Sequence, residues 1–214
     1  MGFDDITKIK RHPERGSYDK DQLLDILRNG FACQVSFQMA GQPFVIPMTY
    51  YNNSEFIYIH GSNAARIINH LRERNPVAIS VLELNGLVLA KRLADNSLNY
   101  RSAVIFGKPV EITDKEEKLS FFKEWINNLV PGRAENTILP TDEDLRGVAV
   151  FKVSLEQFSI KVRKGGATEV KGRPDLWSGV IPFSIEFHNP EFASDSITPE
   201  YVQRFIDRRN GKIQ

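Results

Sequence analysis

The sequence predicts a single domain built around an antiparallel β-barrel that is closed or nearly closed and carries helices on its outside. Two observations predict it. Six or seven short segments of alternating or apolar residues, separated by turn signals, fill most of the region 32–163. The connections between them are short, which favours hairpins over parallel crossovers. A chain of 214 residues with 41% hydrophobic residues can form such a core without cross-links.

Composition excludes several classes of protein. The net charge of +1 excludes a strongly basic nucleic-acid footprint. A single cysteine, Cys33, excludes an intrachain disulfide and a multi-thiolate metal site, and no other metal-ligand spacing stands out. The N-terminus has no apolar signal region, and no apolar run reaches the ~20 residues that span a bilayer. We therefore expect a cytoplasmic protein, with the nucleus as an alternative, that needs neither membrane nor nucleic acid.

The first half of the chain predicts two helices among three strands. Asp19 can cap the first helix and Gly30 can end it. The strands read as two successive hairpins, and the second helix carries apolar residues at helical spacing. The expected elements are a helix over 19–30, strands over 32–39, 43–51 and 55–61, and a helix over 63–74.

The second half predicts further strands and two helices. Asn85-Gly86 predicts a tight hairpin turn between strands 76–84 and 87–93. A later strand bends at 107–109, and Asp114 caps a helix. The remaining expected elements are a strand over 101–112, a helix over 114–130, two strands within 146–163, a loop-rich stretch over 164–195 and a helix from Thr198 as cap, with Pro199 as first residue, to Arg209.

A first candidate site lies at the turn between strand 55–61 and helix 63–74. Gly61 allows close backbone approach, Ser62 offers a hydroxyl, and Arg66 can grip two oxygens of an anion near the free N–H groups of a helix start. The alternative is an ordinary capped helix with a solvated arginine.

A second candidate is the polar start of a strand, where an alternating strand sends Tyr100 and Ser102 to one face and Arg101 to the other. A polar loop is the alternative. A third candidate joins Lys161 and Arg163, which share a strand face, to Trp177 in a glycine-rich loop. Trp177 could cover a bound ligand as part of a lid, or it could anchor the loop to the core, and the sequence favours neither role.

The chain lacks the usual motifs of side-chain catalysis, including nucleophile elbows, phosphate-binding loops, dinucleotide fingerprints and zinc-protease motifs. Cys33 lies in an alternating strand and reads as a buried small hydrophobe in preference to a reactive thiol. An enzyme with this sequence is therefore expected to rely on a bound cofactor.

Seven segments taken in order resemble the pyridoxamine 5′-phosphate oxidase-like FMN-binding split-barrel family. The nearer branch is the flavin-nucleotide-binding and nitroimidazole-resistance-related group, and the resemblance runs from about Arg11 to Pro182. The segments are RHPERGSYD (11–19), GQPFVIPMTYY (41–51), IYIHGSNAAR (57–66), SLNYRSAVIFG (97–107), PGR (131–133), KVRKGG (161–166) and LWSGVIP (176–182).

The resemblance implies a six-stranded antiparallel split barrel with peripheral helices, and a homodimer with FMN sites at the interface. The sequence itself indicates an irregular lead-in over 1–18, and the expected domains are the barrel over 19–185 and a helical tail over 186–214. Residues matching the family's cofactor positions fall in four groups, along a strand backbone, around the phosphate turn, at a strand start and in a late segment. They are Pro47, Met48, Thr49 and Tyr50; His60, Gly61, Ser62, Ala65 and Arg66; Asn99, Tyr100, Arg101 and Ser102; and Lys161, Arg163 and Trp177.

The function that the resemblance implies is an FMN-dependent oxidoreductase acting on a small molecule. Arg101 or Lys161 is expected to supply a positive charge beside the ring. The tail lacks the paired substrate-phosphate residues of true pyridoxamine phosphate oxidases, so vitamin B6 oxidation is not expected. Two alternatives remain open. One is a carrier or sensor of flavin or pyridoxal phosphate without turnover, and the other is a haem-binding protein in which His60 or His188 faces the iron.

Overall fold

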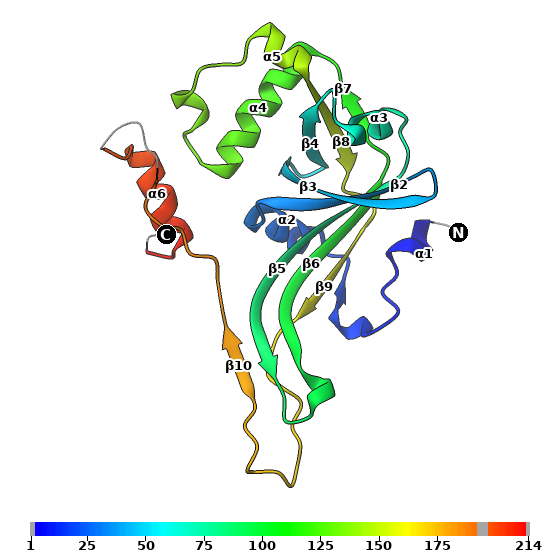
Figure 1. Ribbon diagram of the computed structural model, residues 1–214, viewed down its shortest axis with the longest axis vertical. Helices are drawn as coiled ribbons and strands as arrows, with labels where there is room; N and C mark the ends of the chain where they lie inside the picture. The colour runs from blue at the N-terminus through cyan, green and yellow to red at the C-terminus, as the bar shows by residue number, and fades with distance from the viewer. Residues whose placement is uncertain (1–2, 192–196, 213–214) are drawn as a thin grey trace.

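The computed structural model describes residues 3–191 and 197–212, and its described strands form one antiparallel sheet that curls into a half-barrel (Figure 1). The sheet order is β1-β9-β6-β5-β2-β3-β4-β8-β7, and β10 pairs with β5. The strands are β1 Gly16–Ser17, β2 Ala32–Met39, β3 Gln42–Asn52, β4 Phe56–Ser62, β5 Val77–Leu89, β6 Ser97–Gly107, β7 Val110–Ile112, β8 Val148–Ser154, β9 Phe158–Arg163 and β10 Gly179–Pro182.

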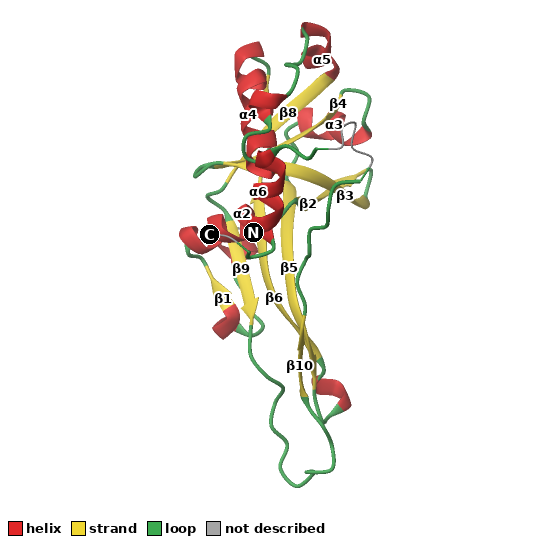
Figure 2. Ribbon diagram, turned by 90° about the vertical axis from the view of Figure 1, so that its left-hand side faces the viewer, coloured by secondary structure: helices red, strands yellow, loops and turns green. Residues whose placement is uncertain are grey.

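Helices lie on the outside and at the ends of this sheet (Figure 2). The α-helices are α1 Phe3–Thr7, α2 Lys20–Asn29, α3 Arg66–Arg72, α4 Lys115–Leu129, α5 Asp142–Gly147 and α6 Glu200–Arg209. Three single turns of 3-10 helix are η1 Pro13–Arg15, η2 Leu93–Asp95 and η3 Ala134–Asn136. Over the described residues, no helix combines the length and the apolar character needed to cross a bilayer.

Carboxylate side chains cap the first turns of α2 and α4. The Asp19 carboxylate accepts a hydrogen bond from the Gln22 N–H at 2.7 Å, and Asp114 accepts one from the Glu117 N–H at 2.8 Å. Each bond satisfies an orphan donor of the first turn. Both predicted caps are confirmed. The helix after β4 is shorter than expected and begins at Arg66, while α6 begins at Glu200 with Pro199, not Thr198, as its N-cap.

The core fills the inside of the half-barrel. Alternate residues of β2, Cys33, Val35 and Phe37, point inward and are at most 5% exposed. Helix α2 closes one end with three fully buried side chains, and the Tyr50 hydroxyl of β3 donates to the Leu27 carbonyl at 2.7 Å. A second apolar cluster fixes α4 against the other side of β4, β7 and β8, around Phe121.

The predicted barrel class is confirmed, but the predicted strand count of six is wrong because short edge strands extend the sheet. β1 pairs with β9, β7 with β8 and β10 with β5, and each has two to four residues. The lead-in over 1–18 therefore contains a helix, a 3-10 turn and a strand, where an irregular segment was expected. Strands this short carry too few residues for a period to be recognised.

The predicted hairpin at Asn85-Gly86 is wrong, because β5 runs unbroken from Val77 to Leu89 and the chain turns through η2 instead. A register shift against β6 lies at this dipeptide. Its other side meets β10, and a Cβ built on Gly86 would lie 3.1 Å from the Ile181 carbonyl oxygen. Inside a strand, a glycine commonly marks a bulge or a place where another backbone comes close. Gly86 marks both, and it does not form a hairpin turn.

We expect Gly86→Ala to loosen β10, because the added methyl group must displace a backbone carbonyl, at a cost of about 1–3 kcal/mol. Amide hydrogen exchange over 179–182 should quicken while exchange in β2 stays unchanged. Gly147→Ala is the matched control, since a Cβ there meets nothing within 4 Å. Unchanged protection of β10 would contradict this account of Gly86.

Candidate functional site

The outward face of the sheet collects residues from three of the predicted groups. One continuous row of paired residues crosses it, from Pro47 through Gln34, Ser80 and Val104 to Ser159. Side chains directly opposite one another point to the same face, and the neighbours of these residues along each strand form the core. The row therefore lies on the outside of the half-barrel.

The adjacent rows of this outward face hold five more of the predicted residues. Thr49 lies two residues beyond Pro47 on β3, Ser102 pairs with Lys161, and Tyr100 pairs with Arg163. Pro47 and Thr49 are exposed, and the other four are partly exposed. The structure thus brings six predicted residues from β3, β6 and β9 onto one accessible surface, which we call the outer sheet face: Pro47, Thr49, Tyr100, Ser102, Lys161 and Arg163.

Lys161 is one of two cations on this face, and it lies on β9 at the end of the face opposite β3. Its ammonium donates to the Arg11 carbonyl at 2.9 Å, and no carboxylate contacts it among the residues that the structure describes. Its positive charge is therefore not neutralised by a neighbour. A cation held in this way can stabilise negative charge on a bound group.

Arg101 does not join this face. As the alternation of β6 predicts, it points the other way from Tyr100 and Ser102, toward the inner end of the barrel. Its guanidinium pairs with Asp25 of α2 and lies 3.3 Å from the Glu83 carboxylate. Burial raises the pKa of Glu83, and the Arg101 charge opposes that rise. Arg101 thus neutralises acidic groups inside this chain, and Lys161 is the better placed of the two expected cations.

The turn after β4 forms a second group. The Ser62 carbonyl accepts from the Ala65 N–H at 2.8 Å, and α3 starts at Arg66 with Ala65 as an N-cap that has no side-chain oxygen. No acidic residue lies in the first turn. The exposed Arg66 guanidinium lies 5.4 Å from the Phe44 ring centre and has no carboxylate partner among the described residues. The arrangement leaves N–H donors and one cation for an anion.

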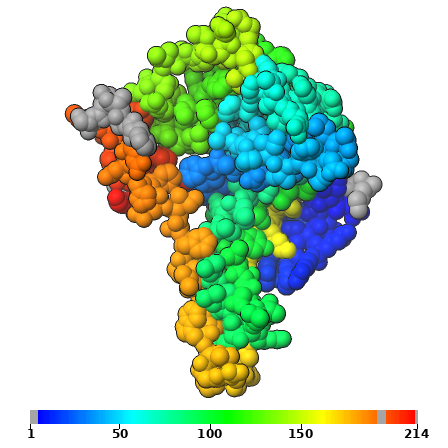
Figure 3. Space-filling model, viewed as in Figure 1, coloured from blue at the N-terminus to red at the C-terminus, as the bar shows by residue number. Residues whose placement is uncertain are grey.

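Three predicted residues have side chains elsewhere. Met48 packs against the core, and the Tyr50 side chain is 1% exposed, so along this part of β3 they offer a ligand only their backbone. Trp177 is 67% exposed and lies two residues before β10, the strand that pairs with the end of β5. Its ring lies against Gly179, the first residue of β10. Figure 3 shows these segments as an arm that projects from the rest of the molecule.

His60 lies under α4 and not in the turn itself. The ring centres of Phe121, Phe122 and Trp125 lie 5.5, 5.6 and 4.8 Å from that of His60. Burial lowers the pKa of His60, so its ring is neutral at pH 7. Its Nδ1 atom is buried without a hydrogen-bond partner. His188, the other histidine considered for a haem, is exposed.

Across residues 3–191 and 197–212, no group of three or more histidine, cysteine, aspartate or glutamate side chains is arranged to hold a metal ion.

Asn99 links β6 to the loop after β9. Its side-chain amide donates to the Gly165 carbonyl at 3.1 Å, and its side-chain oxygen accepts a hydrogen bond from Arg163.

The predicted burial of Cys33 is confirmed, because the side chain is 1% exposed. Burial raises the pKa of the Cys33 thiol to about 12. Near pH 8 only about one thiol in 10,000 is then ionised. We expect the folded protein to resist a disulfide reagent such as Ellman's reagent, and one thiol per chain to react after unfolding in guanidinium. Rapid labelling of the folded protein would contradict the buried placement.

Comparison with known proteins gives matches among solved structures, whereas no curated protein matches the chain. The flavocytochrome Anf3 from Azotobacter vinelandii is 28% identical, with a TM-score of 0.87 over 94% of this chain and 96% of that one. The FAD and haem binding protein from Mycobacterium smegmatis is 24% identical, with a TM-score of 0.84 over 90% and 97%. A Bacteroides thetaiotaomicron protein assigned to 5-nitroimidazole antibiotic resistance is 26% identical, with a TM-score of 0.59 over 69% and 86%.

Residues 19–162, which are more than half of the chain, match the sequence pattern of the family described as pyridoxamine 5′-phosphate oxidase. The matched range begins at the Asp19 cap of α2 and ends in β9, so it spans the half-barrel and most of the outer sheet face. Sequence and fold therefore agree, and the chain belongs to the pyridoxamine 5′-phosphate oxidase family.

Proposed function

We propose that this protein binds FMN on the outer sheet face and works as an oxidoreductase on a small molecule. The observation that carries the proposal is the gathering of six predicted residues on one accessible face, together with a helix start whose arginine has no acidic partner in the described part of the chain. The flavocytochrome at 28% identity supports the flavin by its name, and membership of the family supports the reaction class.

The residues present fit a flavin phosphate and ring. Arg66 and the uncapped start of α3 provide positive charge and N–H donors for a phosphate. The outer sheet face offers the flat backbone of β3, the hydroxyls of Thr49 and Ser102, and the Lys161 cation. A bound flavin supplies one- and two-electron transfer, so the absence of a general base among these residues is no obstacle.

We further propose that the protein is a homodimer that covers this face. Val45, Leu82 and Leu84 lie on the same side of the sheet and are 61%, 57% and 42% exposed. Apolar side chains gathered on an open sheet face favour association. Light scattering on the flavin-loaded protein should give twice the chain mass, and a monomer with stoichiometric flavin would contradict a shared site.

The visible spectrum of the purified protein tests the cofactor first. Bands near ~370 and ~450 nm, present on purification or after adding FMN and removing the excess, are expected of an oxidised bound flavin. Bleaching by a nicotinamide nucleotide, with turnover when an acceptor is supplied, would support the oxidoreductase. A flavin that binds but is not reduced by such donors would favour the carrier or sensor, and a protein that takes up no flavin would refute the proposal.

Haem binding is a second candidate, favoured by one observation. The His60 ring lies against aromatic side chains, and its Nδ1 atom is buried without a partner. The flavocytochrome with the same fold supports haem by its name. Adding haem should produce a Soret band that His60→Ala removes. A band that survives this substitution would exclude His60 as the ligand.

A further inference from the structure

Three polar side chains tie the turn after β4 to the elements around it. They are Asn63 in the turn itself, Arg72 in the last turn of α3 and Glu111 on β7, and we call them the Asn63 clamp. Figure 1 shows β7 beside α3 near the top of the molecule, and the two elements are in contact. The clamp therefore connects both ends of the turn-and-helix unit to the edge of the sheet.

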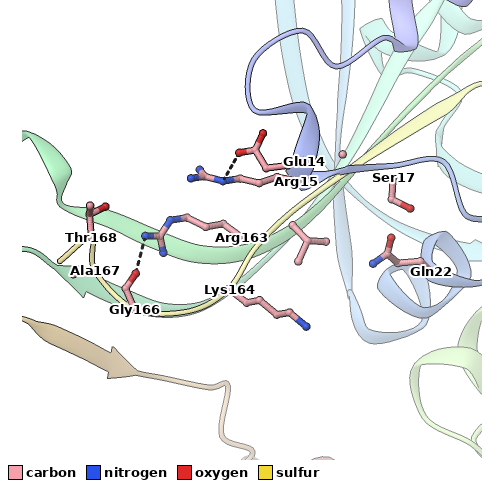
Figure 4. Close-up of a pocket in the computed structure, with 11 residues that line it drawn as sticks. Glu14, Arg15, Ser17, Gln22, Arg163, Lys164, Gly166, Ala167 and Thr168 are labelled. Carbon is pink, nitrogen blue, oxygen red and sulfur yellow. Dashed lines mark hydrogen bonds and ion pairs between the residues drawn. The ribbon is translucent and has the colours of Figure 1, made fainter.

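Glu111 binds Arg72 with both of its carboxylate oxygens. The Arg72 Nε atom donates to these oxygens at 3.2 and 3.1 Å, and the Nη2 atom donates to one of them at 2.9 Å. A two-pronged contact of this kind fixes the plane of the guanidinium. The Glu14–Arg15 pair is different (Figure 4), because its nitrogen–oxygen distance is 3.7 Å. Glu111 thus sets the direction of the Arg72 side chain as well as neutralising its charge.

Arg72 and the end of α5 hold Asn63 from two sides. The Arg72 Nη2 atom also donates to the Asn63 side-chain oxygen, and the Asn63 side-chain amide donates to the Arg146 carbonyl. The backbone N–H of Asn63 donates to the Gly147 carbonyl at 3.1 Å. Asn63 lies three residues before Arg66, so these bonds fix the stretch of backbone that leads into α3.

We propose that the Asn63 clamp positions the turn after β4 for the phosphate of the flavin. The clamp holds the backbone that carries the Ser62 hydroxyl and the Arg66 guanidinium, and its own side chains are positioning residues that bind one another and neighbouring carbonyls. Groups that are already ordered bind a ligand more tightly, because ordering them during binding costs free energy. The inference rests on the function proposed above and assigns part of the flavin affinity to residues outside the contact set.

The sign of the Glu111 charge separates positioning from a simple charge effect. Glu111→Gln removes a negative charge beside α3 and leaves the positive charge of Arg72 without its counter-charge. Electrostatics alone would then strengthen the binding of a phosphate. Loss of positioning weakens it, because the two-pronged contact is lost and Arg72 no longer holds Asn63 in a fixed place.

Fluorescence titration of the flavin-free full chain with FMN and, separately, with riboflavin tests the clamp. Riboflavin lacks the phosphate, so it reports on the ring site alone. We expect Glu111→Gln to raise the dissociation constant of FMN about three- to tenfold, as for the loss of one hydrogen-bonded contact, and to leave riboflavin binding unchanged. The control is Glu117→Gln, which removes a carboxylate that binds Lys152 of β8 at 3.1 Å and should bind both ligands as the wild type does.

Amide hydrogen exchange on the flavin-free protein adds a readout that needs no ligand. The Asn63 N–H should exchange faster in Glu111→Gln than in the wild type, because the bond to the Gly147 carbonyl opens more often. Exchange in β2 should stay unchanged, which shows that the variant is folded. Unchanged protection of Asn63 would contradict the clamp.

Two binding results would also overturn the proposal. One is FMN binding that is unchanged or tighter in Glu111→Gln, and the other is riboflavin binding that weakens as much as FMN binding does. Arg66→Ala separates this failure from a failure of the proposed function. Equal FMN binding by the wild type and Arg66→Ala would count against the phosphate role of the turn itself, whereas weakened binding in Arg66→Ala with unchanged binding in Glu111→Gln would refute the clamp alone.

Discussion

Replacing Arg66 with alanine is expected to weaken flavin binding by about 2–3 kcal/mol, or about 30- to 150-fold, because a charge-assisted partner of the phosphate is lost. The guanidinium is exposed beside Phe44, and no carboxylate competes for it among the described residues. Removing it therefore leaves no buried charge behind, and the loss reports on the ligand. Quenching of flavin fluorescence during titration of the flavin-free protein measures the dissociation constant.

Two further variants make the Arg66 result specific. Arg66→Lys keeps the charge but loses the two-pronged contact, so its affinity should lie between wild type and alanine. Arg204→Ala removes an exposed arginine of α6 whose partner is Glu200 on the same helix, and it should bind flavin as the wild type does. A dissociation constant that is equal in Arg66→Ala and Arg204→Ala would refute the phosphate role of Arg66.

Signals confined to one stretch of chain predicted most of the framework. Strand β2 occupies the predicted range 32–39, and α4 starts after the predicted Asp114 cap. In both cases the residues that specify the element lie within it or next to it. In β2 they are alternating apolar and polar side chains, and in α4 they are a carboxylate three residues before the N–H group that it binds. Such elements are specified by their own residues.

Elements that exist through a distant partner were not predictable in the same way. Asn85-Gly86 carries a strong hairpin signal, yet β10 lies beside it and pairs Pro182 with Gly86. The glycine meets a backbone from about a hundred residues further along the chain, which no local pattern contains. The edge strand β1 follows the same logic, because two residues become a strand only when a neighbour supplies the ladder. By contrast, β7 lies within the predicted strand 101–112, which divides at the predicted bend.

The candidate site shows the same division. Alternation along β6 separated Tyr100 and Ser102 from Arg101, and the structure confirms it. The partners of Arg101 were not predictable, because Asp25 lies 76 residues away on α2. The strand pairing places the two expected cations on opposite faces of the sheet. Lys161 lies on the outer face, and Arg101 points inward, where it contacts acidic groups.

Inside the barrel, Arg101→Met is expected to cost about 2–3 kcal/mol of folding stability. This is below the roughly 3–5 kcal/mol for breaking a fully buried pair, because the Arg101 and Glu83 side chains remain 26% and 16% exposed. The substitution keeps much of the volume but strips Glu83 of its counter-charge, and one Glu83 oxygen is already buried without a hydrogen bond. Urea unfolding measures the loss. Arg92→Met is the control, since its ion pair is exposed and worth little.

The pH dependence identifies the cause of that loss. Burial raises the pKa of Glu83 above its ordinary value, and removing Arg101 takes away the larger of the two positive charges, Arg101 and Arg209, that oppose this rise. A carboxyl group with a higher pKa in the folded state binds more protons there, so stability falls as pH rises from its unfolded pKa through its folded pKa. Arg101→Met should therefore be least destabilising at about pH 5 and most at about pH 8. Glu83→Gln added to Arg101→Met should remove that dependence and recover part of the stability, whereas a loss independent of pH would show that packing, and not the charge on Glu83, is what Arg101 provides.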